Sequence, residues 1–288
     1  PALGEPGELV ARYRGVLPFE LTPSQESAIA EIDGDLSGER PMERLLQGDV
    51  GSGKTVVALY ALLRAVEAGK RGALMAPTET LAEQHFLTLD PICTQLGVPI
   101  ALLTRSVKHD VGAAQVVVGT HALIQEGVDL GDLGVAVVDE QHRFGVEQRA
   151  ALTTGRRPHV LHMTATPIPR TLALTVYGDL SVTEIAKPPA NRKPIETAWV
   201  TEERSSAAYQ RLRKHLDAGR QAYVVCPLIE ESETSVARAA EREAERLRKG
   251  ELRDYRVGLL HGRLRPDERR DLMARFNARE LDVLVATT

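Results

Sequence analysis

The feature that most constrains how this chain can fold is a glycine-rich octapeptide that fits G-x-x-x-x-G-K-[ST] at every fixed position. Its sequence is Gly48-Asp49-Val50-Gly51-Ser52-Gly53-Lys54-Thr55. Glycines let such a loop curl until successive N–H groups point at an anion, and a helix that starts there adds its positive dipole end. Lys54 would then reach the β- and γ-phosphates of a nucleotide, and the Thr55 hydroxyl would bind Mg²⁺. The motif predicts a phosphate-binding loop.

The flanking sequence favours this interpretation over a chance match in a glycine-rich turn. Arg44 to Gln47 is typical of a strand that leads into the loop. Val56 to Ala68 is typical of a helix that leads out, and Gly69 is well placed to end it. A strand, a phosphate loop and a helix in this order form one α/β unit.

Composition allows a packed protein of one large or two ordinary domains, because 43% of the 288 residues are hydrophobic. The net charge of −4 does not indicate a nucleic-acid partner, but a local basic track would be enough for one. Cys93 and Cys226 stand far apart, as expected of small buried residues in a reducing compartment. No apolar run approaches the roughly 18 residues of a membrane helix, so we expect a cytoplasmic protein without membrane contact.

Apolar runs alternate with helical patterns, which indicates an α/β protein whose parallel sheet is covered on both faces. Residues 1–20 are poorly periodic, and we expect a lead-in segment there, before a helix that Thr22 caps and Pro23 opens. The strands predicted after the loop are Gly72 to Ala76, Ile100 to Leu103, Val116 to Val118, Val135 to Val138 and Val160 to Met163. Thr104 to Gln115 is short for a crossover between parallel neighbours, so either these two strands are not adjacent or residues are absent there.

Proline and charge concentrate at residues 187–194, as they do at domain boundaries, and we place the domains at 1–190 and 191–288. The second domain should begin with a strand at Ile195 to Val200. Further strands are predicted at Ala222 to Cys226, Val257 to Leu260 and Asp282 to Ala286, between helices at about Glu203 to Ala218, Ser235 to Lys249 and Asp267 to Asn277. Ending on an apolar strand would leave core faces uncovered, so we expect this domain to be incomplete at its C-terminus.

An acidic run, Asp139-Glu140-Gln141-His142, directly follows the predicted strand that ends at Val138. Open α/β sheets bind their ligands at this end of their strands. In phosphoryl transfer to water, Asp139 would hold Mg²⁺ through water, and Glu140 would orient and deprotonate the attacking water. The alternative is an acidic turn in which His142 is a solvated or capping residue. A complete phosphate loop with Lys54 favours a catalytic role for all four residues.

The phosphate loop, the acidic run and Thr164-Ala165-Thr166 together resemble a superfamily 2 helicase motor of the DExH kind. The resemblance implies two RecA-like domains, with ATP and Mg²⁺ as cofactors. Residues 21–25 resemble that family's adenine-reading element, which implies Gln25 as a paired donor and acceptor and Phe19 as a stacking face. Thr164 to Thr166 would link the ATP site to DNA contact.

Other runs resemble the elements with which this family holds a nucleic-acid backbone. Their residues are Pro77, Thr78, Gln84, Gly119, Thr120 and His121 in the first domain, and His261, Gly262 and Arg263 in the second. Structural alternatives exist for most of them. Thr78 and Gln84 could be ordinary helix-start and surface residues, and Thr120 and His121 could simply end a buried strand. Backbone contacts of this kind imply little sequence preference and strong salt dependence.

Two longer runs, residues 139–149 and 163–171, are similar to the RecG family of branched-DNA translocases. Transcription-repair coupling translocases are the alternative, but they usually carry Glu where this chain has Gln141. The resemblance implies an ATP-driven motor that remodels forked or branched DNA, and we expect a monomer that acts at the bacterial nucleoid. The family's arginine-bearing motif and wedge domain are not matched, so an ATP-binding module with little turnover is another alternative. A small-molecule kinase of the phosphate-loop class finds no support after Asp139.

Overall fold

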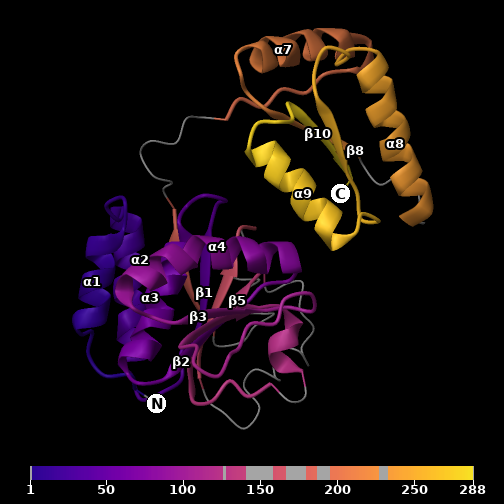
Figure 1. The fold of residues 1–288 in the computed structure, drawn as a ribbon. Coiled ribbons are helices and arrows are strands. Elements are labelled where there is room, and N and C mark those ends of the chain that lie inside the picture. Colours follow the sequence, from indigo (N-terminus) through magenta and orange to yellow (C-terminus); the bar gives the residue numbers. More distant parts are fainter. Residues whose placement is uncertain are drawn as a thin grey trace. The chain divides into compact units, whose positions relative to one another are not determined.

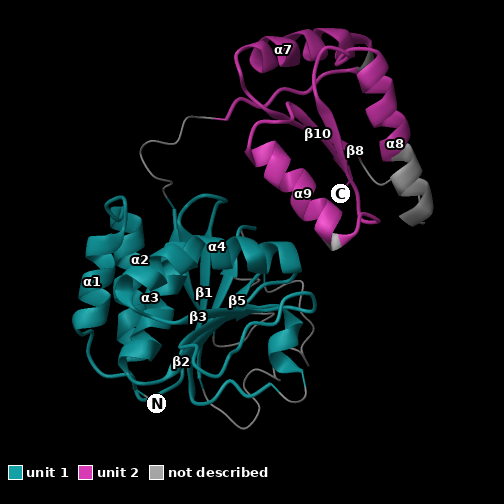
Figure 2. Cartoon of the chain, viewed as in Figure 1, with its two compact units in different colours: residues 1–193 teal, residues 194–288 magenta. Residues whose placement is uncertain are grey.

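The computed structural model of the chain describes residues 2–125, 128–140, 158–166, 180–186, 195–226 and 233–287. The chain divides into two compact units, Pro1–Lys193 and Pro194–Thr288, which Figure 2 colours separately. The division falls close to the boundary that we place between residues 190 and 191.

In unit 1, seven described strands form one parallel sheet in the order β3-β4-β2-β5-β6-β1-β7. They are β1 (Glu43–Gly48), β2 (Arg71–Met75), β3 (Ile100–Leu103), β4 (Val116–Gly119), β5 (Leu133–Asp139), β6 (His159–Thr164) and β7 (Ser181–Ile185). The helices are α1 (Glu8–Val16), α2 (Pro23–Leu36), α3 (Lys54–Glu67) and α4 (Glu79–Leu96), with a short η1 (His121–Ile124). The predicted α/β class is confirmed, and β7 is an additional strand.

Side chains of the sheet alternate between two apolar clusters, as the two-residue period of a strand requires. Along β5, Val135 and Val137 join one cluster, while Ala136 and Val138 join the other. The first cluster also contains buried side chains of α1 to α4. Figure 1 shows these helices beside the sheet. The second contains η1 and part of the segment before β5. Burial on both faces explains why the strands are continuous apolar runs.

The connection from β3 to β4 shows how parallel neighbours can be joined without a helix. The two strands are adjacent and parallel, so the first of our two alternatives for residues 104–115 is wrong. Because β3 is an edge strand, the chain can turn back along it. Lys108 forms an antiparallel bridge with Leu103, and the His109 N–H donates to Leu102 O at 3.0 Å. Whether residues are absent from this connection stays a prediction.

The expectation of a lead-in segment before the first helix is wrong for residues 8–16, which form helix α1. Its Tyr13 is fully buried and donates its hydroxyl to Val56 O at 2.8 Å. The N-terminus of α1 is capped from another helix, because the Glu67 carboxylate of α3 accepts the N–H groups of Gly7 and Leu9 at 2.7 and 2.6 Å. The segment is therefore an integral part of unit 1.

In unit 2, three described strands form a parallel sheet in the order β8-β10-β9. They are β8 (Ala222–Cys226), β9 (Val257–Leu260) and β10 (Val283–Thr287), and the helices are η3 (Glu202–Arg204), α7 (Ser205–Asp217), α8 (Glu233–Lys249) and α9 (Pro266–Asn277). Leu216 of α7 and Leu247 of α8 pack on one side of the sheet, and Phe276 of α9 belongs to a separate cluster with Leu284. Cys93 is buried as expected, but Cys226 is only partly buried.

The strand predicted at residues 195–200 is wrong, because these residues lie outside any strand and Trp199 is 87% exposed. Apolar composition alone does not make a strand, since the backbone N–H and C=O groups also need a neighbouring strand to pair with. Here an ion pair of 2.7 Å between Glu196 and Arg211 ties the segment to α7. None of the described helices is long and apolar enough to cross a membrane.

Candidate functional site

The sheet of unit 1 brings the predicted catalytic residues together at the carboxyl ends of its strands. Strand β6 lies between β1, which leads into the phosphate loop, and β5, which ends at Asp139. In the register of the strands, Gln47 is the partner of Thr164 and Asp139 is the partner of Met163. Because all three strands are parallel, the loop, the acidic pair and Thr164 meet at the carboxyl ends of the strands, where such sheets bind ligands.

The phosphate loop adopts a backbone that its glycines make accessible. Gly51 and Gly53 have φ values of +78° and +90°, in the left-handed region that favours glycine. A side chain at Gly53 would clash with the Gln25 amide, and a Cβ at Gly48 would lie 2.6 Å from the Ser52 hydroxyl. The loop therefore needs glycine both for its conformation and for the close packing of its neighbours.

Gln25 ties helix α2 to the loop. Its Nε2 donates to Ser52 O at 2.9 Å, and its Oε1 accepts the Thr22 N–H at 2.8 Å in a capping box. Gln25 is only 2% exposed, so these contacts engage much of the amide that we expected to read adenine. Phe19 is 48% exposed and lies in the wall of a pocket of about 600 Å³ that also includes Arg14. Stacking by Phe19 stays a prediction.

Lys54 lies between the loop and the acidic pair. Its Nζ donates to Gly48 O at 2.6 Å and to Asp49 O at 3.1 Å. Burial lowers the pKa of Lys54, whereas the nearby carboxylates of Asp139, Glu140 and Asp49 act in the opposite direction. Both acids of the predicted pair therefore favour the charged form of the lysine that we expect to bind phosphate.

Asp139 is held by a residue that no motif in the sequence indicates. The His85 Nε2 and the Asp139 Oδ2 lie 2.7 Å apart, and both side chains are nearly buried. His85 lies on α4, one residue after the predicted Gln84. The only signal in the sequence is this adjacency, since 54 residues separate the two partners.

Glu140 is held in a different way. Its φ of +49° lies in the left-handed region, which is uncommon for a residue with a side chain. Its Oε1 accepts the Ala165 N–H at 3.3 Å, so it contacts the segment after β6. In that segment, the hydroxyls of Thr164 and Thr166 are hydrogen-bonded at 2.8 Å. The predicted residues Gln141 and His142 lie outside the described residues.

These residues fit a nucleotide with its magnesium ion. Ser52 Oγ is buried in the loop and has no hydrogen-bond partner, so one hydroxyl donor of the loop is left without an acceptor. Thr55 lies in the first turn of α3, where N–H groups have no partner within the helix. Mg²⁺ usually keeps several waters and takes one or two protein oxygens in addition to substrate phosphates, so the Thr55 hydroxyl could bind it and Asp139 could hold it through water.

The residues predicted to hold nucleic acid in unit 1 have different surroundings. Thr78 is the N-cap of α4, where its hydroxyl accepts the Leu81 N–H at 3.3 Å, and Gln84 on that helix is exposed. Thr120 is 1% exposed and caps η1, so its side chain supports the local fold, whereas His121 is exposed. A side chain at Gly119 would clash with Leu103 O, and Pro77 is half-buried before α4.

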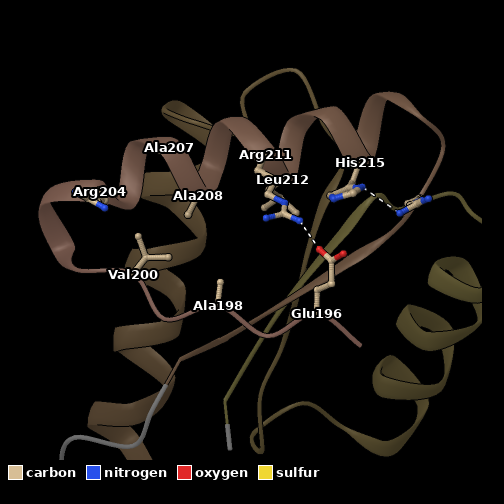
Figure 3. A pocket seen from close by; sticks show the side chains of 10 residues that line it. Glu196, Ala198, Val200, Arg204, Ala207, Ala208, Arg211, Leu212 and His215 are labelled. Atoms are coloured by element: carbon tan, nitrogen blue, oxygen red, sulfur yellow. Dashed lines mark hydrogen bonds and ion pairs between the residues drawn. The ribbon is translucent and has the colours of Figure 1, made fainter. Parts of the chain in front are cut away.

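In unit 2, the predicted residues form the turn after β9. Gly262 and Arg263 are exposed, and the His261 Nδ1 accepts the Arg263 N–H at 3.3 Å. A pocket of about 860 Å³ lies elsewhere in this unit, between α7 and the segment that contains Glu196 and Val200 (Figure 3). Among the described residues that line it, none belongs to the predicted set.

Comparisons with known proteins agree with this geometry. Residues 22–175 match the DEAD/DEAH box helicase family, and residues 207–288 match the helicase conserved C-terminal domain. The chain therefore belongs to the DEAD/DEAH box helicases. Within this class it is similar to RecG, since it is 46% identical over 293 residues to the ATP-dependent DNA helicase RecG of Synechocystis. The resemblance to RecG is confirmed.

That alignment covers 98% of this chain and 35% of the Synechocystis protein, so the chain spans about a third of this relative's length. A solved structure of RecG bound to a three-way DNA junction aligns with a TM-score of 0.78 and 39% identity, over 100% of this chain and 39% of that chain. S. cerevisiae Dbp5 bound to RNA and ADP BeF3 shares the fold, with a TM-score of 0.72 and 18% identity, over 99% of this chain and 74% of that chain.

Proposed function

We propose that this chain is the motor core of an ATP-dependent DNA translocase that remodels forked or branched DNA. The observation that carries the proposal is the meeting of the phosphate loop, the Asp139–Glu140 pair and Thr164 at one edge of the sheet. Similarity to RecG, one example of which was solved with a three-way junction, supports branched DNA as the substrate.

Each of these residues would have its own chemical role. Lys54, the Ser52 hydroxyl and the N–H groups of the loop would bind the phosphates. Thr55 and Asp139 would hold Mg²⁺, which when bound neutralises charge that develops on the phosphates. Glu140 would orient the attacking water and accept its proton.

Contacts among the same residues would couple the ATP site to the DNA-binding residues. Glu140 contacts the Ala165 N–H, and Thr164 and Thr166 are bonded to each other, so a change at the acid would reach this segment. Gln84 and His121 of unit 1 and Arg263 of unit 2 are exposed residues that would face the DNA backbone. We propose that the protein acts as a monomer in the bacterial cytoplasm, with little sequence preference.

The test is steady-state ATP hydrolysis by the chain with and without forked DNA, in the wild type and two variants. Glu140→Gln should bind an ATP analogue with an affinity close to that of the wild type but lose at least about a hundredfold in turnover, because the water loses its base. Lys54→Ala should lose most binding of the analogue, because the phosphates lose a partly buried cation.

The two variants separate the roles of binding and chemistry. Hydrolysis at the wild-type rate by Glu140→Gln would show that another group is the base. If forked DNA does not stimulate turnover by the wild-type chain, the chain is an ATP-binding module that needs further parts to act as a motor. A matched duplex without a fork, at several salt concentrations, tests the preference for branched DNA.

A further inference from the structure

The contact between His85 and Asp139 joins two elements that the proposed function treats separately. His85 lies in the second turn of α4, the helix whose N-cap is Thr78, and Asp139 is the last residue of β5. The His85 Nε2 and the Asp139 Oδ2 are 2.7 Å apart, and the side chains are 12% and 11% exposed. A contact this short between two nearly buried groups fixes both side chains.

The geometry of this contact suits a carboxylate that must bind a metal ion. With Oδ2 accepting from the imidazole, the carboxyl plane is set and Oδ1 is directed elsewhere. Neutral imidazole with its proton on Nε2 is sufficient for this bond. Carboxylates that bind metals in proteins are commonly oriented by such outer partners, whose loss typically weakens metal binding by 10- to 100-fold.

We propose that His85 is a positioning residue for Asp139: it holds the carboxylate in the orientation that binds Mg²⁺ with ATP, and so ties helix α4 to the metal site. The inference rests on the proposed function, because it needs Asp139 to hold the metal ion. It adds a residue to the site that the phosphate loop and the acidic run do not include.

The test measures metal binding directly, with Mn²⁺ as the probe. Mn²⁺ is titrated into the chain in the presence of a non-hydrolysable ATP analogue, and free Mn²⁺ is followed by electron paramagnetic resonance. His85→Leu, which has no donor, should weaken Mn²⁺ binding by about tenfold. Its affinity for the analogue without metal should stay within about twofold of the wild type, since the loop is intact.

Two further variants separate the hydrogen bond from the packing of the side chain. His85→Gln keeps an N–H donor near the position of Nε2, and it should bind Mn²⁺ within about threefold of the wild type. Leu87→Ala is the matched control, because Leu87 lies on the same helix and is 70% exposed. It should bind Mn²⁺ as the wild type does. If His85→Leu does not fold, His85→Ala takes its place in the same titration.

Asp139→Asn distinguishes failure of this inference from failure of the proposed function. If Asp139→Asn weakens Mn²⁺ binding but a folded His85→Leu binds Mn²⁺ like the wild type, the role of His85 is overturned and the metal assignment stands. If His85→Gln is as weak as His85→Leu, the hydrogen bond is not what positions Asp139. If Asp139→Asn binds Mn²⁺ like the wild type, the metal assignment itself fails, and the inference fails with it.

Discussion

The two neighbouring acids at the end of β5 are held by different local constraints. Asp139 is fixed by a side chain from α4, through His85. Glu140 is fixed by its own left-handed backbone and by the Ala165 N–H. A backbone in a sparsely populated region is commonly retained where function depends on it, which supports the choice of Glu140 as the base.

At the phosphate loop, a single added methyl group should be costly. Gly53→Ala places a side chain at φ +90° and against the Gln25 amide, which must then release Ser52 O. We expect a loss of about 2–3 kcal/mol in the free energy of unfolding, of which roughly 1–2 comes from backbone strain and about 1 from the hydrogen bond. Chemical denaturation of the variant, together with binding of an ATP analogue, measures both effects.

Gly15→Ala is the matched control for this prediction. Gly15 lies within α1, is exposed, and has nothing within 4 Å of an added Cβ. Alanine favours a helix over glycine by about 0.5–1 kcal/mol, so this variant should be slightly more stable than the wild type. A Gly53→Ala protein as stable as the wild type would show that the loop relaxes without strain.

Among the elements, helix α1 depends most clearly on a distant residue. Glu67→Ala removes the carboxylate that accepts the N–H groups of Gly7 and Leu9. Loss of a helix cap costs about 0.5–2 kcal/mol, and because α1 packs on α3 we expect the upper half of that range. Limited proteolysis should then cut within residues 8–16 sooner than in the wild type, and thermal unfolding should begin at a lower temperature.

Glu39→Ala provides the control for Glu67→Ala, because Glu39 is an exposed carboxylate of the same unit. It should change the free energy of unfolding by no more than about 0.5 kcal/mol. If both variants are cleaved alike, the cap does not hold α1 in place, and the buried Tyr13 alone is responsible.

The same helix shows which elements could be predicted from the sequence. Strands β1 and β5 and helix α3 can be predicted from the sequence, because apolar runs and a contiguous loop motif are local signals. Helix α1 cannot be predicted in this way, since Gly7 supplies no side-chain cap and the cap comes from Glu67, about 60 residues away. Residues 195–200 lead to the opposite error, a predicted strand that is not formed. Their composition is typical of a strand, but none of the described strands pairs with them.

The candidate site likewise contains residues that could be predicted from the sequence and residues that could not. The phosphate loop and Asp139–Glu140 are contiguous runs with fixed chemistry, so their residues could be named from the amino-acid sequence alone. His85 could not be found, because its meaning depends on a contact across 54 residues. Adenine reading by Gln25 stays a prediction, and the structure adds that its amide contacts Thr22 and Ser52 within the chain.

At the scale of the whole molecule, each unit has apolar clusters of its own. The clusters of unit 1 contain only residues before the division at Lys193, and those of unit 2 contain only residues after it. A unit with its own core can unfold by itself. The proposed phosphate-binding residues all lie in unit 1, so ATP binding and the stability of unit 2 should be separable.

Leu247→Ala tests this separation. Leu247 of α8 is fully buried in unit 2, and truncation of a buried leucine costs about 2–5 kcal/mol. We expect calorimetry to show two transitions in the wild type, of which only the one belonging to unit 2 moves down in this variant. Leu62→Ala, in the core of α3, should instead lower the transition of unit 1 and weaken binding of an ATP analogue, because α3 carries Lys54 and Thr55. A shift of both transitions by Leu247→Ala would show that the two units do not unfold independently.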